Sequence, residues 1–246
     1  MTPDTLSRII RAFRWLVALA AIGVAGLWAM GRYREHPEDF PWTQLDLKQP
    51  IGMFTGRKLA RLVEDPALCH RLLGEAKFRV AAPRDGGAGC SYSNAVSLLD
   101  GGGRGVALRP AEAVMSCSVA AAFIIWEREV VQPAAARHFG QRVVRIDHLG
   151  SYSCRRINGR ETSDWSEHAT ANAIDVAAFT LKDGRRIAVV SGWQGAGADA
   201  AFLREVRDGS CRVFATTLSP DYNFAHRDHF HLDQARRGAV GGGYCR

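Results

Sequence analysis

An uncharged apolar run near the N-terminus, from Trp15 to Met30, most constrains how this chain folds. It is rather short for a membrane span, which needs about 20 residues, and lies at the upper end for the core of a signal peptide. Arg8, Arg11 and Arg14 precede it, and a basic flank of this kind stays in the cytoplasm. No small-x-small cleavage site follows, so an uncleaved signal anchor is favoured over a cleaved signal peptide and over a buried helix.

This reading divides the chain into four parts. We expect a cytoplasmic basic N-terminus at 1–14, a transmembrane signal anchor at 15–31, a linker at 32–50 and a folded domain at 51–246. The linker is rich in proline, charge and aromatic residues. The protein is therefore expected to cross the inner (cytoplasmic) membrane once, with its main domain in the periplasm.

The composition favours a globular domain outside the apolar run. Of the 246 residues, 47% are hydrophobic and 9% aromatic, which suffices for one substantial core. The net charge of +7 is spread along the chain. No zinc-finger, basic-zipper or RNA-recognition pattern accompanies it, so we expect no nucleic-acid partner.

The cysteines agree with export. There are six, and none forms a C-x-x-C pair. An even number scattered over an exported domain predicts three disulfides, with free buried thiols as the alternative. The preferred pairing, with others left open, is Cys69–Cys90, Cys117–Cys245 and Cys154–Cys211.

Apolar spacing and turn signals predict an α+β domain with flanking helices and an antiparallel sheet. Helices are expected at 56–73, capped by Thr55, at 116–139 with a kink or end at Pro133, and at 200–207. The expected strands lie at 143–146, 211–218 and 229–232, with a hairpin at 173–181 and 185–190 around Asp183-Gly184. Glycine-rich stretches at 84–89 and 100–103 predict loops.

Two short segments supply the chemistry. Ser166–Asp175 contains a histidine and a carboxylate, and His226–His231 contains three histidines. Alternate side chains of a strand share a face, so His229, His231 and Asp233 should point one way. Asp175 should share a face with Ala177, Phe179 and Leu181. If the two strands are neighbours, Asp175 and His231 can meet on one ion, with His168 folding over from the preceding loop.

Two imidazoles and a carboxylate suit Zn²⁺ and leave a fourth position open for water. Each segment alone has a plainer interpretation. The H-x-H pair could be solvated side chains on a strand, and His168 with Asp175 could be a turn and a salt-bridged carboxylate. Together, behind an export signal, they favour a metal site.

The spacing also carries a resemblance. Ser166-x-His168-x-x-Ala171-x-Ala173-x-Asp175 resembles the signature of the D-Ala-D-Ala metallopeptidases and related murein endopeptidases, with Ala171 where glycine is usual. His226-x-x-His229-x-His231 is similar to the second motif of the penicillin-insensitive murein endopeptidases. From Phe54 to Arg246 the chain resembles the bacterial extensin-like C-terminal domain family.

The resemblance implies that His168, Asp175 and His231 bind Zn²⁺. His229 would act beside the activated water as general base or as a stabiliser of developing charge. Asp228 stands where some members carry a glutamate base, so the base remains open among His229, Asp228 and His226. For His226 and Asp228, orientation of the ligands is the favoured role.

Arg155 lies in a segment similar to the G-Y-R stretch of these peptidases, where an arginine contacts substrate or stabilises the transition state. An alternative is that Arg155 covers the sheet edge. Ser166 is expected to hydrogen-bond the site loop or to cap it.

These features lead to one expected function and two alternatives. The expected function is a zinc peptidase, of D-Ala-D-Ala carboxypeptidase or murein endopeptidase type, that cleaves peptide bonds of peptidoglycan by a metal-activated water. The first alternative is a non-catalytic cell-wall-binding or scaffold domain that retains the metal site. The second is a structural zinc site that His229 closes as a fourth ligand.

Overall fold

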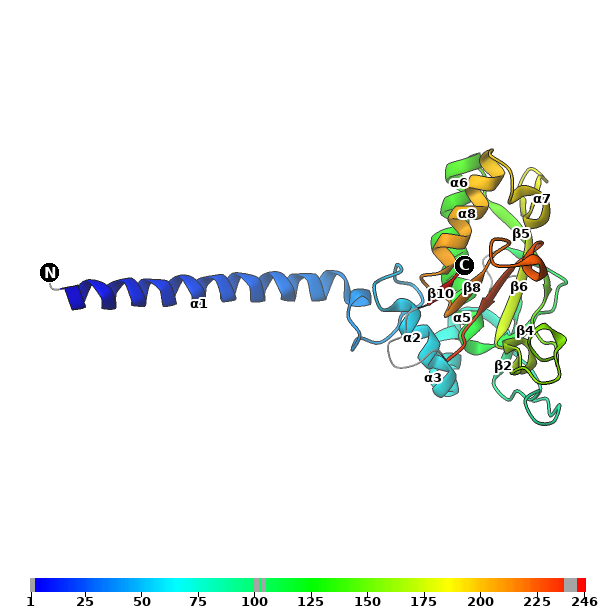
Figure 1. Ribbon diagram of the computed structural model, residues 1–246, viewed down its shortest axis with the longest axis horizontal. Coiled ribbons are helices and arrows are strands. Elements are labelled where there is room, and N and C mark those ends of the chain that lie inside the picture. Colours follow the sequence, from blue (N-terminus) through cyan, green and yellow to red (C-terminus); the bar gives the residue numbers. More distant parts are fainter. Residues whose placement is uncertain (1–2, 100–101, 103–104, 237–242) are drawn as a thin grey trace.

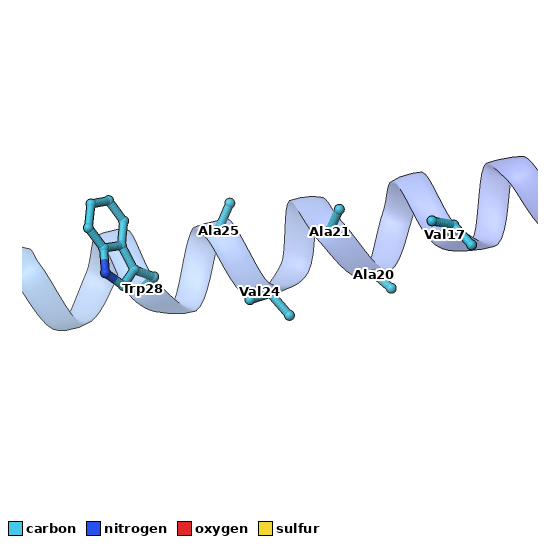
Figure 2. Close-up of a pocket in the computed structure, with 6 residues that line it drawn as sticks. All are labelled: Val17, Ala20, Ala21, Val24, Ala25 and Trp28. Atoms are coloured by element: carbon cyan, nitrogen blue, oxygen red, sulfur yellow. The ribbon is translucent and has the colours of Figure 1, made fainter.

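A long N-terminal helix projects from an α+β domain (Figure 1). The computed structural model describes residues 3–99, 102, 105–236 and 243–246. Helix α1 (Pro3–Glu35) contains a segment, Ser7–Glu35, that is long and apolar enough to cross a membrane by length and composition. An open hollow along it is bounded by α1 itself, from Val17 to Trp28 (Figure 2), so it is a shallow depression of the helix surface.

The segment after α1, predicted as a linker, packs against the domain. It begins with the short 3-10 helix η1 (Pro37–Asp39), and Leu45, Leu47 and Ile51 are buried in the core cluster. Arg128 donates hydrogen bonds to the carbonyls of Leu47 and Gln49. The segment is therefore held in place on both its apolar and its polar side.

The predicted helix at 56–73 is broken in two. Helix α2 (Thr55–Arg61) and the 3-10 turn η2 (Leu62–Glu64) end at Asp65, whose side chain caps α3 (Pro66–Leu72) by accepting from the Leu68 amide at 2.9 Å. Proline cannot continue the preceding helix, so the chain restarts there. The prediction that Thr55 caps α2 was wrong, because Thr55 is already inside the helix and its hydroxyl accepts from the Gly52 amide instead.

A small antiparallel sheet follows the 3-10 turn η3 (Leu73–Glu75). Its order is β1 (Lys77–Val80), β2 (Ala95–Leu99) and β4 (Val114–Ser116). The predicted glycine-rich loop at 84–89 lies between β1 and β2. Of the other predicted loop, 100–103, only Gly102 lies within the described residues.

The predicted helix at 116–139 is confirmed as three consecutive helical segments. They are α5 (Cys117–Trp126), the π-helical turn η4 (Glu127–Val131) and α6 (Gln132–Phe139). Ser116 caps α5, with its hydroxyl 3.3 Å from the Val119 amide. Pro133 sits at the start of α6, directly after the π turn, so the helix does not end there.

The main sheet has seven strands and is mostly antiparallel. Its order is β10-β8-β9-β6-β5-β3, and β7 also pairs with β6. The predicted antiparallel sheet is thus present, but its two edge strands depart from the prediction, because β3 runs parallel to β5 and β10 runs parallel to β8. The strands are β3 (Ala107–Arg109), β5 (Val143–Gly150), β6 (Ala173–Leu181), β7 (Arg186–Ala188), β8 (Thr216–Leu218), β9 (Phe230–Asp233) and β10 (Tyr244–Cys245).

Helices α5 and α8 (Ala198–Ser210) cover one face of this sheet, and α7 (Val189–Gly192) follows β7. Trp126 of α5 lies with its ring centroid 6.0 Å from that of Phe179 in β6, and its indole donates to the Val206 carbonyl of α8 at 3.1 Å. The core therefore lies between helices and sheet and leaves the opposite face of β6 and β9 free for polar residues.

Strand β6 contains one extra residue. Asp147 of β5 pairs with Ala178, but the next residue, His148, pairs with Val176, so Ala177 has no partner in β5. A bulge of this kind inverts the alternation of side chains. Phe179 consequently joins Val176 in the core, and the prediction that Asp175 shares a face with Phe179 and Leu181 was wrong.

All six cysteines form disulfides, as predicted, but each predicted pairing was wrong. The bonds are Cys69–Cys117, Cys90–Cys154 and Cys211–Cys245. Cys69 of α3 lies against the start of α5, which places it near Cys117 rather than near the loop cysteine Cys90. The pairing follows the packing of helices, which the sequence spacing does not reveal.

Candidate metal centre

Three elements bring the candidate ligands together. Asp175 lies in β6 directly opposite His231 of β9, and His168 belongs to the 3-10 helix η6 (Glu167–Thr170) that precedes β6. Antiparallel partners on one face have close side chains, so the two strand residues meet without any loop. The predicted convergence of these three residues is therefore present in the structure.

A tight turn folds η6 back over the strand. Ala171 adopts left-handed backbone angles, with φ of 57°. Two hydrogen bonds close the turn: the Ala171 amide donates to the His168 carbonyl, and the Asn172 amide donates to the Glu167 carbonyl. Glycine adopts this conformation without strain, which explains why glycine is usual at this place in the resembling motif. Ser166 caps η6 by accepting from the His168 amide at 3.3 Å.

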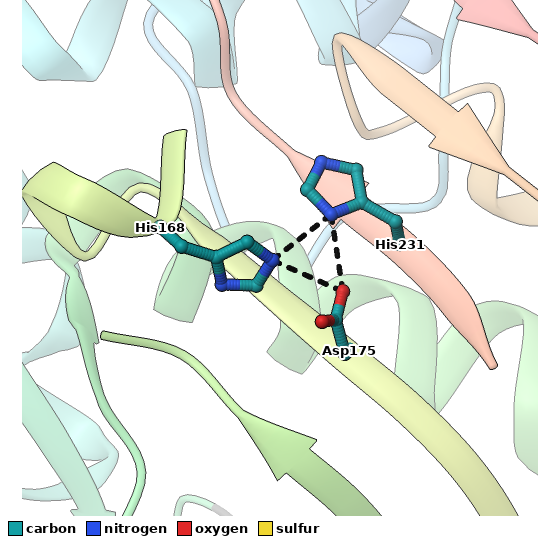
Figure 3. A group of neighbouring side chains, drawn as sticks. All are labelled: His168, Asp175 and His231. Atoms are coloured by element: carbon teal, nitrogen blue, oxygen red, sulfur yellow. Dashed lines mark hydrogen bonds and ion pairs between the residues drawn. The ribbon is translucent and has the colours of Figure 1, made fainter. Parts of the chain in front are cut away.

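The three ligand atoms form a nearly equilateral triangle (Figure 3). His168 Nε2 lies 3.1 Å from Asp175 Oδ1 and 3.0 Å from His231 Nδ1, and His231 Nδ1 lies 3.0 Å from Asp175 Oδ1. All three side chains are buried. Water therefore has little access to this face of the triangle.

The far side of each imidazole is also held. His168 Nδ1 donates to the Ser151 carbonyl at 2.6 Å, and His231 Nε2 donates to Asp233 at 3.0 Å. In the neutral tautomers that these bonds select, the lone pairs of His168 Nε2 and His231 Nδ1 both point at the Asp175 oxygen. Three acceptors that converge in this way need a positive charge between them.

The pKa values reflect the same demand. Burial disfavours the charged form of His231, but hydrogen bonds and charge from Asp175 and Asp233 outweigh it and raise the pKa of His231 to about 9. Burial likewise opposes ionisation of Asp175, yet bonds to His168 and His231 and the charge of nearby histidines hold the pKa of this carboxyl far below its usual range. Without a metal, the site holds a proton on His231 and an ionised Asp175.

This donor set fits zinc. Two imidazole nitrogens and one carboxylate oxygen, each oriented from behind by a carbonyl or a carboxylate, are the ligands and the supporting groups of catalytic zinc sites. A divalent cation supplies the charge that the triangle lacks. His168, Asp175 and His231 are thus the residues that could hold Zn²⁺.

His229 lies beside the triangle rather than in it. Its Nε2 is 3.6 Å from Asp175 Oδ1, and its Nδ1 donates to Asp228 at 2.8 Å. The Asp228 contact leaves the Nε2 lone pair facing the centre. The sequence predicts that the strand starts at His229, but β9 begins one residue later, at Phe230. His229 nevertheless lies on the same face as His231.

His226 packs against both of these histidines. Its ring centroid lies 5.2 Å from that of His229 and 5.9 Å from that of His231, and its Nδ1 contacts Asn223. Burial and the charge of the two histidines lower the pKa of His226 to about 4, and Arg155 contributes to this shift. Arg155 is exposed, and its backbone carbonyl accepts from the Ser166 amide at 3.1 Å, which holds it beside the turn that carries His168.

The sequence did not predict two residues that support the site, Ser151 and Asn172. Ser151 acts through its backbone carbonyl, for which a sequence carries no signal. Asn172 links η6 to the helix layer: its amide donates to Glu167 at 2.6 Å, and its oxygen accepts from Ser116, the cap of α5, at 2.8 Å. Its only sequence signal was its position inside the motif.

The fold and the site together define an α+β domain built around a buried His-Asp-His group with an adjoining Asp-His pair. The chain belongs to the family described as extensin-like protein C-terminus, whose model matches residues 67–246. Membership is thus confirmed, over a slightly shorter stretch than the resemblance suggested. No curated protein and no solved structure matches the chain significantly.

Proposed function

We propose that this protein is a membrane-anchored zinc peptidase that hydrolyses peptide bonds of peptidoglycan on the periplasmic side of the inner membrane. One observation carries the proposal. His168 Nε2, His231 Nδ1 and Asp175 Oδ1 converge within 3.0–3.1 Å of one another while both imidazoles are fixed from behind. The relation of this family to the D-Ala-D-Ala metallopeptidases is part of the proposal.

The compartment rests on two further features. Within α1, three arginines precede the apolar run, an arrangement that keeps the N-terminus in the cytoplasm. The three disulfides suit an oxidising compartment. Both features favour a domain that lies outside the cytoplasm and within reach of cell-wall peptides.

Zinc held by the triangle would polarise a peptide carbonyl and lower the pKa of a water at the open fourth position. Among the protein's own residues, His229 is the first candidate for proton transfer. Its Nε2 faces the centre and can accept the proton of that water, while Asp228 holds the ring in the required tautomer and stabilises the imidazolium. His229 then returns the proton to the leaving amine.

His226 is a poorer base. A pKa near 4 keeps His226 neutral at pH 7 but makes it a weak proton acceptor, so we assign it to packing the His229 ring. Asp228 is assigned to orientation because it already accepts the proton of His229 Nδ1. His229 is therefore the proposed general base.

Arg155 is assigned to the substrate. Its guanidinium is exposed near His226, and a guanidinium binds a carboxylate through two parallel hydrogen bonds. Stem peptides end in a carboxylate, so Arg155 would bind this carboxylate and thereby position the scissile bond. Arg156 is committed elsewhere, since it stacks on Trp165 at 4.4 Å and donates to the Ser163 carbonyl.

The test is mass spectrometry of muropeptides treated with the full-length protein, wild type beside His231→Ala. The matched control is His138→Gln, a histidine that pairs with Glu205 at the protein surface. We expect new cleavage products from wild type and control, none from His231→Ala, and about one zinc per wild-type chain.

The alternatives give different results. Bound zinc with unchanged muropeptides would support a cell-wall-binding domain and sink the peptidase. Loss of zinc and unfolding in His229→Ala would instead indicate a closed structural site, in which His229 completes the coordination. Absence of zinc from the wild-type protein would remove the proposal altogether.

A further inference from the structure

Two large apolar side chains stand exposed just beyond the end of α1. Trp42 is 71% exposed and Met53 is 80% exposed, whereas the leucines between them are buried in the core. Single exposed apolar side chains are common, so these two are informative only through their position next to the end of α1.

Short chains of contacts link both residues to the last turn of α1. Tyr33 of α1 packs its ring 5.3 Å from Phe40, and Phe40 packs 5.3 Å from Trp42. On the other side, Arg32 of α1 pairs with Asp39, and Asp39 accepts the Met53 amide at 2.9 Å. Trp42 is thus linked to α1 through one intervening residue, Phe40, and Met53 through Asp39.

The end of α1 coincides with the expected membrane boundary. Trp15 and Tyr33 are about 27 Å apart along a helix that rises about 1.5 Å per residue, which matches a hydrocarbon core of about 30 Å. Tryptophan and tyrosine are enriched at the two membrane interfaces. Tyr33 therefore marks the outer interface, and the rings that continue from it lie in the headgroup region.

The segment that carries these residues is fixed. Arg212 donates to the Ile51 carbonyl at 2.6 Å, and Lys58 donates to the Thr43 hydroxyl at 2.7 Å. Gly52 lies so close to Glu38 that an added Cβ would be 2.6 Å from its backbone. The folded segment therefore cannot turn Trp42 away from the end of α1 without breaking these contacts.

We propose that Tyr33, Phe40, Trp42 and Met53 form a membrane collar that seats the domain directly on the outer surface of the lipid bilayer. The partner is the lipid interface, because the ring contacts from Tyr33 through Phe40 to Trp42 continue from the end of the candidate span. Aromatic rings with a polar edge and a flexible thioether suit this mixed environment. The inference rests on the membrane-anchoring part of the proposed function and is independent of peptidase activity.

The experiment uses the full-length protein in nanodiscs of phosphatidylethanolamine and phosphatidylglycerol that contain a lipid with a photoactivatable diazirine near its headgroup. After illumination, crosslinked peptides are mapped by mass spectrometry. We expect crosslinks in α1 and in residues 36–54. The double variant Trp42→Ser, Met53→Ser should reduce labelling of 36–54 several-fold and leave labelling of α1 unchanged.

Phe224→Ser is the control, since Phe224 is equally exposed but lies next to the candidate metal centre. It should alter neither signal. Labelling of α1 without labelling of 36–54 above the level at 222–227 would overturn the collar. Absence of labelling in α1 as well would overturn the membrane anchor, and the peptidase assay would be unaffected by either result.

Discussion

His168 Nε2 and His231 Nδ1 lie 3.0 Å apart, although the second nitrogen of each ring donates its own proton in the opposite direction. Two lone pairs at this separation repel each other unless a positive charge lies between them. In the metal-free protein, the extra proton of His231 supplies that charge. In the proposed zinc form the ion would supply it, so the proton and the ion would compete for the site.

Zinc binding should release a proton at neutral pH. The raised pKa of His231, about 9, means that the metal-free site is protonated at pH 7.5 and must lose that proton to bind the ion. Calorimetric titration in buffers of different ionisation enthalpy should give about one proton released per zinc at pH 7.5, and a value falling towards zero above pH 9.

The raised pKa of His231 also makes the stability of the metal-free protein depend on pH. A pKa raised from 6.5 to about 9 on folding stabilises the metal-free protein fully below pH 6.5, and the contribution disappears as the pH rises through 9. Zinc-loaded protein should lack this loss. Equal pH dependence of the metal-free and the loaded protein between pH 6.5 and 9 would contradict the assignment.

Asp233→Asn should weaken zinc binding without abolishing it. Asp233 accepts the His231 Nε2 proton at 3.0 Å, and such supporting carboxylates typically contribute about 10–100-fold to metal affinity. Competition with a chromophoric chelator measures the effect. His138→Gln should bind zinc as the wild type does, and an unchanged affinity of Asp233→Asn would show that the carboxylate does not orient the ligand.

His229→Ala should retain zinc and lose activity by about 10²–10⁴-fold, as expected for removal of a general base. Asp228→Asn should keep zinc and a folded site, with a smaller loss and an altered pH profile, because the amide can no longer stabilise the His229 imidazolium. Metal content and initial rates across pH 5–9 separate the two roles. Full activity of His229→Ala would transfer the role of base to another group.

Ala171→Gly should stabilise the domain by up to about 1 kcal/mol. A left-handed alanine costs about 1–2 kcal/mol, and the greater freedom of glycine in the unfolded chain takes back part of the gain. Denaturant unfolding measures the difference. Ala169→Gly, in the neighbouring 3-10 turn, should destabilise instead, and a loss of stability in both variants would argue against strain at Ala171.

The candidate site could be predicted because its residues depend on local rules. The alternation of a strand places Asp175 and His231 on accessible faces, and pairing of β6 with β9 sets them opposite each other. The short spacing from His168 to Asp175 limits how far apart they can lie. The relation between the two strands was the one long-range assumption, and it held.

Other features depend on packing that no local pattern encodes. Leu45 and Leu47 lie among polar residues and prolines in the sequence, yet both are buried in the core cluster. The segment that carries them is held by Arg128 of η4, which donates a hydrogen bond to the Leu47 carbonyl. The pairing of Cys69 with Cys117 depends on the contact of α3 with α5. The bulge at Ala177 carries no sequence signal, since alanine is equally at home in a regular strand.

That bulge sets how this sequence can change over evolutionary time. The part of β6 before Ala177 pairs with β9 and carries Asp175 on the face away from the core, and the part after it pairs with β7 and carries Phe179 in the core. Substitutions on either part act locally. Loss of Ala177 itself would restore a regular strand and keep Asp175 and Phe179 on their present faces. A deletion elsewhere in the strand would turn one part over, exposing Phe179 or pointing Asp175 into the helices, unless the bulge straightened to absorb it. The bulge is therefore the place where this strand can lose a residue and still keep both of its faces.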